Sequence, residues 1–197
     1  RAGDLLGRDI STLSFTGPEE ELARTENAQV ALYVNSMAIM AVLDEKGLAA
    51  DLVAGHSLGE YSALAACGAI SFETGLSLVA SRGKAMSEAA AGRPGAMAAI
   101  LGLEDGKVEE ICAFSGEVWP VNYNSPGQLV ISGETASVER AMFQAEAAGA
   151  KKTVRLKVGG SFHSPLMRSA AGVMKEELAQ VEFQDPEPPY LSSITCD

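Results

Sequence analysis

Histidine, cysteine and basic residues are scarce in this chain, and the shortages of cysteine and of basic residues each argue against a class of function. The 197 residues include 2 histidines and 3 cysteines, and 15 lysines and arginines stand against 26 aspartates and glutamates. The net charge of −11 argues against nucleic acid and anionic membranes, because both require a basic surface on the protein. Cys67, Cys112 and Cys196 are too widely spaced for a disulfide framework or a zinc site, and they suit a reducing compartment such as the cytoplasm.

The sequence also lacks a long hydrophobic run, internal repeats and low-complexity segments. The most apolar stretch, residues 30–43, is interrupted by Asn35 and Ser36 and is too short to span a bilayer. We expect no signal peptide and no membrane or nucleic-acid partner. The length and the 47% hydrophobic content suit one domain, or one domain with a subdomain, and we expect a cytoplasmic monomer.

The segment Gly55–Gly59 reads G-x-S-x-G and is the most informative motif of the chain. It follows an apolar run at 51–54 and precedes a helical pattern that begins at Glu60. In this strand–turn–helix context the motif exposes a serine hydroxyl at a helix N-terminus, where backbone N–H groups can stabilise an oxyanion. The motif predicts that Ser57 is a nucleophile. The alternative is a glycine-rich turn whose serine only caps the helix.

A serine nucleophile needs a base, and the two histidines leave a short choice. The side chain of His56, next to Ser57, should point to the other side of the turn. His163 lies in a segment of loop composition, 159–165, and loops held by a scaffold commonly carry catalytic groups. We therefore predict His163 as the general base. The alternative is a helix-entry residue without chemistry.

Hydrophobic periodicity and turn signals predict alternating helices and strands. Residues 26–46 read as an amphipathic helix with Ala28, Leu32 and Ile39 near one face, and residues 51–56 read as a buried strand. We expect further helices at 57–69, 71–90, 105–114, 135–148 and 165–181. We expect further strands at 96–103, 117–124, 128–132 and 151–158.

The order of these elements predicts an α/β protein in two parts. The succession β-α-β-β-α-β over residues 95–158 is that of a ferredoxin-like subdomain, inserted into a larger core of residues 1–94 and 159–197. Ser57 precedes the insertion and His163 follows it, so we expect both in a cleft between the parts. The chain begins at Arg1, and residues 195–197 have strand character. We therefore expect an N-terminal strand and a C-terminal portion outside this sequence.

Four segments together resemble the malonyl-CoA:acyl-carrier-protein transacylases, in order and over nearly the whole chain. They are Ala54–Leu64 (AGHSLGEYSAL), Gly95–Ile100 (GAMAAI), Val121–Gln128 (VNYNSPGQ) and Phe162–Met167 (FHSPLM). The resemblance implies an α/β-hydrolase-like core with a ferredoxin-like subdomain. It implies a ping-pong transfer, for fatty-acid synthesis, from malonyl-CoA to the phosphopantetheine thiol of acyl carrier protein. The intermediate would be a malonyl ester of Ser57, and no cofactor or metal would take part.

The resemblance also assigns roles to other residues. Arg82 would anchor the malonate carboxylate, and the backbone N–H of Leu58 would donate to the oxyanion. Asn122 and Asn124 match an Asn-x-Asn pattern near the family's pocket, although turn-flanking strand residues are an equal alternative. His56 completes the substrate-binding set at the turn. The family's second oxyanion donor lies in a glycine- and glutamine-rich motif that this sequence lacks, as it lacks the downstream segment that holds the histidine.

Arg82 and Phe162 also have interpretations that rest on their surroundings. Arg82 lies on an apolar helix stripe, where a buried guanidinium needs an anion and its planar fork suits a carboxylate; the alternative is an arginine that reaches solvent at the edge of the stripe. Phe162 before the base resembles the pattern of malonyl-selective acyltransferase domains, in which a bulky ring excludes an α-methyl group. The alternative is a core aromatic that anchors the loop.

Three other functions are compatible with the sequence. One is an acyltransferase domain of a polyketide or fatty-acid synthase. Another is a serine hydrolase, which shares the motif and would use an acid between Ser57 and His163, such as Asp105. The third is a non-catalytic module that binds carrier protein.

Overall fold

The computed structural model describes residues 1–197 and divides into two units with their own cores. Unit 1 comprises residues 1–84 and 173–197, and unit 2 comprises residues 85–172. The helices α6 (Phe72–Gly92) and α9 (Arg168–Leu178) each continue from one unit into the other. Both units contain helices and strands, so the predicted α/β class is confirmed.

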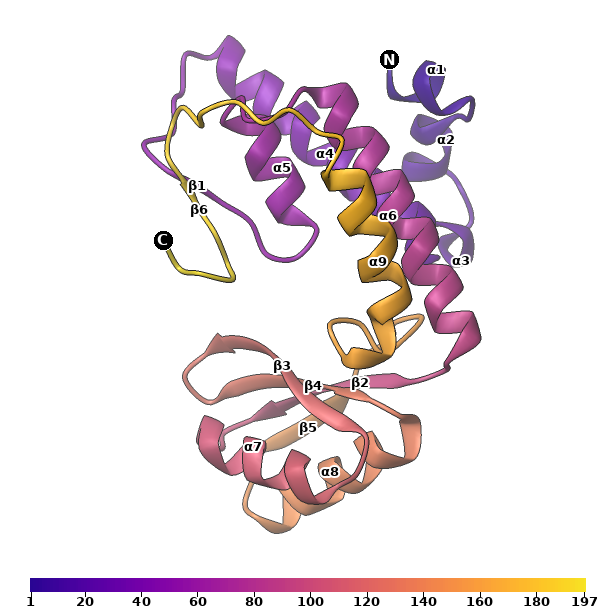
Figure 1. The fold of residues 1–197 in the computed structure, drawn as a ribbon, viewed down its shortest axis with the longest axis vertical. Helices are drawn as coiled ribbons and strands as arrows, with labels where there is room; N and C mark the ends of the chain where they lie inside the picture. Colours follow the sequence, from indigo (N-terminus) through magenta and orange to yellow (C-terminus); the bar gives the residue numbers. More distant parts are fainter. The chain divides into compact units, whose positions relative to one another are not determined.

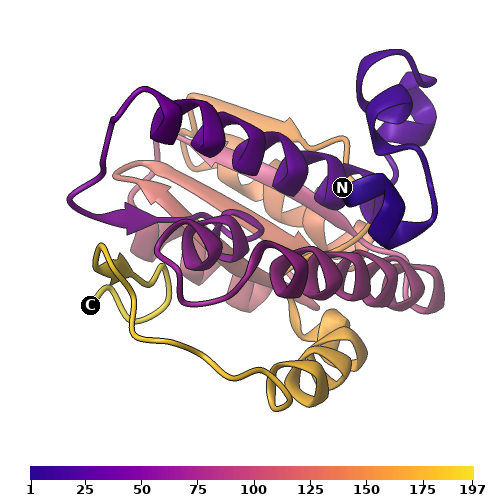
Figure 2. The same ribbon diagram turned by 90° about the horizontal axis from the view of Figure 1, so that it is seen from above.

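Unit 1 is built around the helices α4 (Thr25–Glu45), α5 (Gly59–Ala66) and the first part of α6, which lie next to one another (Figures 1 and 2). Three short helices precede α4: α1 (Ala2–Leu6), α2 (Ile10–Phe15) and α3 (Glu19–Leu22). Val30 and Tyr33 of α4 and Val79 of α6 are fully buried in the core that these helices share.

Helices α4 and α6 approach each other closely at Tyr33. The Tyr33 hydroxyl donates to the backbone carbonyl of Phe72 at 3.0 Å, and the two rings stack with centroids 5.7 Å apart. A Cβ on Gly75 would lie 2.2 Å from that hydroxyl, so the contact requires glycine there. Burial raises the pKa of Tyr33 well above its ordinary value, and the hydroxyl stays protonated as a donor.

The helix predicted at 26–46 is confirmed, but the expected face is wrong. Leu32 and Ile39 are 56% and 52% exposed, whereas the opposite side of the helix, with Val30 and Tyr33, is buried. Helix α4 carries apolar residues on two sides, and periodicity alone does not say which side meets a neighbour. The contact with α6 decides it.

The strands of unit 1 are short. Strand β1 (Val53–Ala54) pairs in parallel with β6 (Tyr190–Leu191), so the strand expected at 51–56 is present but limited to two residues. The strand character of residues 195–197 is a wrong prediction, because residues 193–195 form a turn that Cys196 closes by donating to the Ser192 carbonyl at 3.0 Å. A terminal segment forms a strand only where a partner strand lies beside it.

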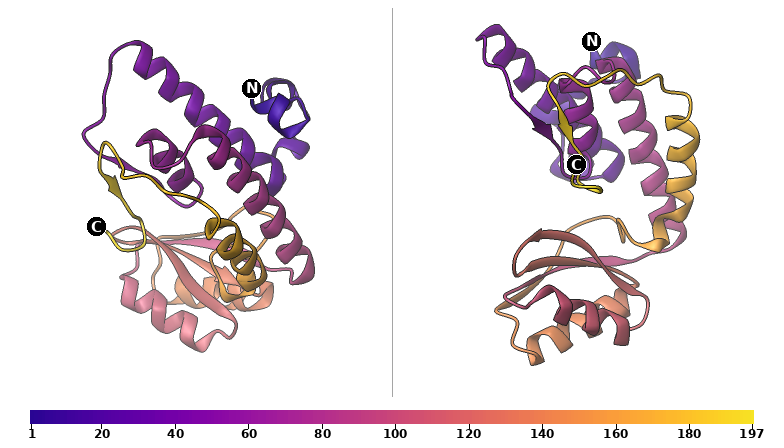
Figure 3. Two further views of the ribbon diagram at one scale, coloured as in Figure 1. Left: turned by 45° about the horizontal axis from the view of Figure 1, so that its top comes forward. Right: turned by 60° about the vertical axis from the view of Figure 1, so that its left-hand side comes forward.

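Unit 2 contains a four-stranded antiparallel sheet with two helices on one face (Figures 1 and 3). Along the chain these elements are β2 (Ala96–Leu101), α7 (Asp105–Phe114), β3 (Val118–Ser125), β4 (Gln128–Gly133), α8 (Thr135–Ala147) and β5 (Lys152–Arg155). The strand order is β3-β4-β2-β5. The predicted order of elements is confirmed, and strands predicted at 96–103 and 151–158 are shorter than expected.

Successive side chains of a strand point to opposite faces of the sheet, so the buried side chains of unit 2 form two groups, one on each face. Ala98, Ile100 and Ile131 face α7 and α8, where Val138 and Ala141 are also buried. The opposite face carries Met97, Ala99 and Val130, and Phe162 packs against them. The loop before α9 therefore rests on the sheet face that the helices leave uncovered. It leads into the 3₁₀ helix η1 (Pro165–Met167) and then α9, which ends at Leu178, three residues short of the prediction.

We predict that Ile131→Ala destabilises the protein by about 2–5 kcal/mol, because the side chain is 0% exposed and its loss leaves a cavity. Phe143→Ala serves as the control, since Phe143 of α8 is 73% exposed and its removal should change stability by about 0.5 kcal/mol or less. Urea unfolding of the full chain, followed by circular dichroism, measures both. Equal losses in the two variants would contradict this description of the core.

Candidate active site

The backbone reverses direction at Ser57, between β1 and α5. Ser57 has a φ of 55°, a conformation that residues other than glycine rarely adopt. Backbone hydrogen bonds close the turn, from Gly59 N–H to the His56 carbonyl at 2.9 Å and from Glu60 N–H to the Ser57 carbonyl at 3.2 Å. Strained backbone of this kind clusters at functional sites. The turn therefore has the form that the motif predicted.

The two glycines of the motif contribute differently to this turn. A Cβ on Gly55 would lie 2.0 Å from the backbone carbon of Gly59, so any larger residue at 55 would force the turn apart. A Cβ on Gly59 would meet nothing within 4 Å. The structure thus requires glycine at position 55, whereas position 59 has room for a side chain.

Arg82 of α6 lies beside the Ser57 hydroxyl. Its Nη2 donates to Ser57 Oγ at 2.9 Å, Nη1 donates to Gln29 Oε1, and the guanidinium carbon lies 5.8 Å from the centre of the Tyr61 ring. Burial lowers the pKa of Arg82, and the nearby Tyr61 and Glu60 oppose this shift. A partly buried guanidinium bound to two neutral oxygens can gain much from a carboxylate, since charged acceptors bind it more strongly.

Gln29 is a site residue that the sequence analysis missed. It lies on the buried side of α4 and is 7% exposed. Its side-chain oxygen accepts a hydrogen bond from Nη1 of Arg82, while Nη2 of the same guanidinium donates to Ser57. The signal in the sequence is a polar amide within an apolar helix, and a buried amide needs a partner. Without knowledge of which side of α4 is buried, that signal could not be used.

Glu60, which follows the motif, connects α5 to the end of the chain. Its carboxylate accepts from the Ser193 backbone N–H at 2.9 Å and from the Ser193 hydroxyl at 2.8 Å. Burial has the largest single effect and would raise the pKa of the Glu60 carboxyl. The hydrogen bonds from Ser193 and Tyr190 and the charge of Arg82 together outweigh it and hold the pKa below its ordinary value. The carboxylate stays ionised at neutral pH, near the N-terminus of α5, where a negative charge is favourable.

His163 lies in unit 2, at the end of the loop that precedes η1. It has a φ of 63° and an exposed side chain. Phe162 before it packs against buried residues of α6 and of the sheet, and Leu166 and Met167 after it are buried. Ser57 and His163 are thus two of the three non-glycine residues with a positive φ in this chain, the third being Cys196.

The other predicted site residues divide between the two units. In unit 1, Leu58 is the N-cap of α5, and the side chain of His56 is exposed. In unit 2, Asn122 and Asn124 lie on β3, where Asn124 is exposed, and the pairing of β3 with β4 is irregular on both sides of Asn122. The structure brings Ser57 and Arg82 together within unit 1. The pairing of Ser57 with His163 stays a prediction.

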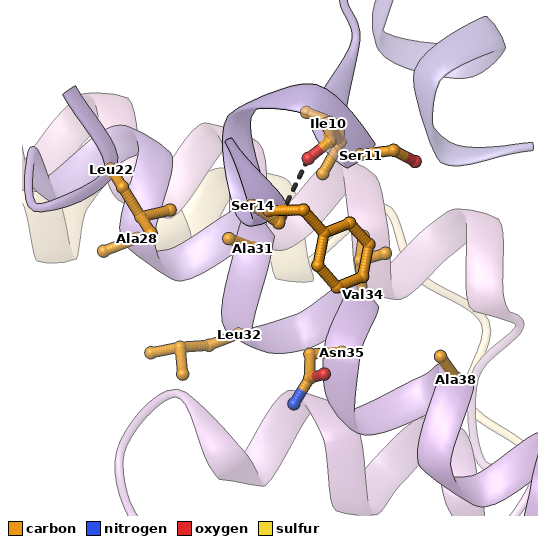
Figure 4. A pocket seen from close by; sticks show the side chains of 11 residues that line it. Ile10, Ser11, Ser14, Leu22, Ala28, Ala31, Leu32, Val34, Asn35 and Ala38 are labelled. Atoms are coloured by element: carbon orange, nitrogen blue, oxygen red, sulfur yellow. Dashed lines mark hydrogen bonds between the residues drawn. The ribbon is translucent and has the colours of Figure 1, made fainter. Parts of the chain in front are cut away.

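An apolar pocket of about 510 Å³ lies elsewhere in unit 1, between α2 and α4 (Figure 4). Its larger apolar lining residues are Ile10, Phe15, Leu22, Leu32 and Val34, and no lining residue is charged. Its serines include Ser14, whose hydroxyl donates to the Ile10 carbonyl at 2.7 Å. None of its lining side chains is an acid or a base that could assist a nucleophile such as Ser57.

The chain holds no group of three or more histidine, cysteine, aspartate or glutamate side chains placed to bind a metal ion. No helix is both long enough and apolar enough to cross a membrane.

A serine at a strained strand-to-helix turn on an α/β scaffold is typical of enzymes that form acyl-serine esters, and in this chain a guanidinium lies beside that serine. The acyl transferase domain family matches residues 5–197, and the chain belongs to this family. It is 42% identical over 200 residues to the malonyl CoA-acyl carrier protein transacylase of Bacillus subtilis strain 168, covering 100% of this chain and 63% of that protein. The chain therefore spans less than two thirds of the length of this relative.

Two further relatives extend the comparison. A solved complex of a malonyl-transacylase with the holo acyl-carrier protein of a type II polyketide synthase has a TM-score of 0.94 and 44% identity, covering 100% of this chain and 65% of that one. The polyketide biosynthesis protein ThaF of Burkholderia thailandensis is 41% identical over 197 residues, which cover 98% of this chain and 17% of that protein.

We predict that Gly55→Ala destabilises the protein by about 3 kcal/mol, because the new Cβ collides with the backbone of Gly59. Gly59→Ala should instead be neutral or stabilise by up to about 1 kcal/mol, since alanine loses less chain entropy on folding. Chemical denaturation of the two variants measures the difference. A tolerated alanine at 55 would contradict the close approach at the turn.

Proposed function

We propose that this chain transfers the malonyl group of malonyl-CoA to the phosphopantetheine thiol of acyl carrier protein, and so supplies extender units for fatty-acid synthesis. The observation that carries the proposal is the 2.9 Å contact between Arg82 Nη2 and Ser57 Oγ. A malonyl ester on Ser57 ends in a carboxylate two carbon–carbon bonds beyond the ester carbonyl carbon. A cation close to the nucleophile can bind that carboxylate, and Arg82 is so placed.

The proposed reaction has two half-reactions that use the same groups. His163 takes the proton of the Ser57 hydroxyl as Oγ attacks the thioester carbon, the Leu58 N–H stabilises the oxyanion, and coenzyme A leaves with the proton as a thiol. In the second half, His163 takes the proton of the carrier-protein thiol. The sulfur attacks the ester carbon, and Ser57 regains its hydroxyl.

Arg82 would change partners during this cycle. Without substrate, its Nη2 donates to the Ser57 oxygen, which as a hydroxyl can still donate its own proton. The malonyl carboxylate is a stronger acceptor and would replace Ser57 at the guanidinium, while Gln29 keeps its place. We assign His56, Asn122 and Asn124 to the substrate pocket, and Phe162 to the exclusion of an α-methyl group.

The finer architecture belongs to the same proposal. We infer an α/β-hydrolase-like core of residues 1–94 and 159–197 and a ferredoxin-like subdomain of residues 95–158. The strand order β3-β4-β2-β5 supports the subdomain, because it places the first and third strands of the unit at the centre. The parallel pair β1–β6 and the turn at Ser57 support the core. We also propose a monomer without cofactor or metal, and the free thiols of Cys67, Cys112 and Cys196 support a reducing compartment such as the cytoplasm.

The likeness to ThaF favours a second candidate, an acyltransferase domain of a polyketide synthase. The chemistry at Ser57 would be the same, and the acceptor carrier protein would differ. Transfer rates to a fatty-acid carrier protein and to a polyketide carrier protein, measured side by side, distinguish the two functions.

We predict that brief mixing with malonyl-CoA adds one malonyl group to the chain, and that Ser57→Ala abolishes this adduct because the nucleophile is gone. His163→Ala should slow its formation by about two to four orders of magnitude, the usual contribution of a positioned base. Intact-mass spectrometry measures both, and circular dichroism checks that the variants fold. Free malonate without an adduct would indicate a hydrolase, and an adduct on Ser57→Ala would refute the assignment.

We predict that Arg82→Ala reduces malonyl transfer by about 2–4 kcal/mol of transition-state free energy, since the substrate carboxylate loses a charged partner. Acetyl transfer should fall far less, or rise, because an acetyl group brings no carboxylate to the guanidinium in the wild type. The ratio of the two rates is informative, because a destabilised protein would lose both. An unchanged ratio would mean that Arg82 is structural.

A further inference from the structure

The backbone at His163 needs an explanation that the proposed reaction does not provide. Residues 161–164 form a tight turn in which His163, the third residue, has a φ of 63°. Turns with a positive φ at this position usually place glycine or asparagine there, because a side chain is strained. A histidine persists in this conformation only if its surroundings enforce it.

The side chain of Ser164 ties the turn together. Its hydroxyl donates to the Ser161 carbonyl at 2.7 Å, and its backbone N–H donates to the same carbonyl at 3.4 Å. The hydroxyl oxygen also accepts from the Leu166 N–H at 3.3 Å, which caps η1. Ser164 is 6% exposed, so water competes little for these bonds. One hydroxyl therefore connects the start of the turn to the first residues of the helix that follows.

The neighbours of His163 are fixed on both sides. Phe162 packs against the sheet and α6, while Leu166 and Met167 are buried. Between these anchors, the path of the backbone depends on the bonds that span His163. Ser164 is the only residue whose side-chain hydroxyl spans His163 by donating to the Ser161 carbonyl.

We propose that Ser164 is a positioning residue, whose hydroxyl holds the turn that keeps His163 in the left-handed conformation and so sets the direction of its imidazole. The consequence for catalysis rests on the proposed function, in which His163 is the base. The effect of Ser164 on the backbone of His163 is independent of the proposed function.

Ser161 offers a matched control within the same turn. It is 0% exposed, and its hydroxyl oxygen makes no hydrogen bond to the protein, so only its backbone carbonyl takes part in the turn. Removal of this hydroxyl should leave His163 unchanged. Two buried serines three residues apart thus differ in whether their hydroxyls bridge the turn.

The test compares Ser164→Thr, which keeps a hydroxyl, with Ser164→Val, which has the same shape without one, and adds Ser161→Ala. Selective ¹³C,¹⁵N labelling of histidine gives NMR signals from His56 and His163 alone, because the chain has 2 histidines. We expect the backbone and ring signals of His163 to shift or broaden in Ser164→Val, and to match the wild type in Ser164→Thr and Ser161→Ala. The signals of His56 should stay unchanged in all three variants and report that unit 1 remains folded.

The rate of malonyl-adduct formation is the second readout. In Ser164→Val the maximal rate should fall about 10- to 100-fold, as expected for a misplaced catalytic group, with the KM for malonyl-CoA unchanged. His163 signals that are alike in Ser164→Thr and Ser164→Val, whether native or shifted, would overturn the proposal. His163 signals that respond as expected in a chain that forms no malonyl adduct would leave the positioning role intact and refute the proposed function instead.

Discussion

The site depends on a reversal of the backbone within the five residues Gly55–Gly59. The glycine at 55 allows the end of β1 to lie against the start of α5, and this approach forces a positive φ at Ser57, at a cost of about 1–3 kcal/mol. Within unit 1, β1 before the turn pairs with β6, and Glu60 after it bonds to Ser193. Leu58 of the turn packs against the core that α4 and α6 share. The position of the nucleophile is a consequence of this packing.

Arg82 shows how the packing of helices produces chemistry. A guanidinium on an apolar stripe loses hydration, which costs free energy. Its contacts with Gln29, Tyr61 and Ser57 compensate only part of that cost. A site of this kind binds best a ligand that brings its own negative charge. The proposed malonyl substrate brings a carboxylate to the place where the nucleophile lies, so selectivity and positioning have the same physical origin.

Much of the fold could be predicted from the sequence. The helices at 26–46 and 105–114 and the hairpin around Pro126–Gly127 appear close to the expected residues, because helix periodicity and turn residues act locally. Predictions failed where a partner decides the outcome. The buried side of α4 was wrong because both sides are apolar, and the strand at 195–197 was wrong because no strand lies beside it. The roles predicted for Ser57, Arg82 and His163 rest on motif and resemblance and stay predictions.

The sequence by itself determined the strained turn at Ser57, since G-x-S-x-G between a strand and a helix has few other backbone solutions, and it limited the choice of a base to two histidines. Only the tertiary structure decided that Gln29 holds Arg82 and that the Ser164 hydroxyl ties the turn at His163. Gln29 and Arg82 are far apart along the chain and meet because α4 packs on α6. The bond of Ser164 is local, but it forms because burial removes the water that would otherwise satisfy its hydroxyl.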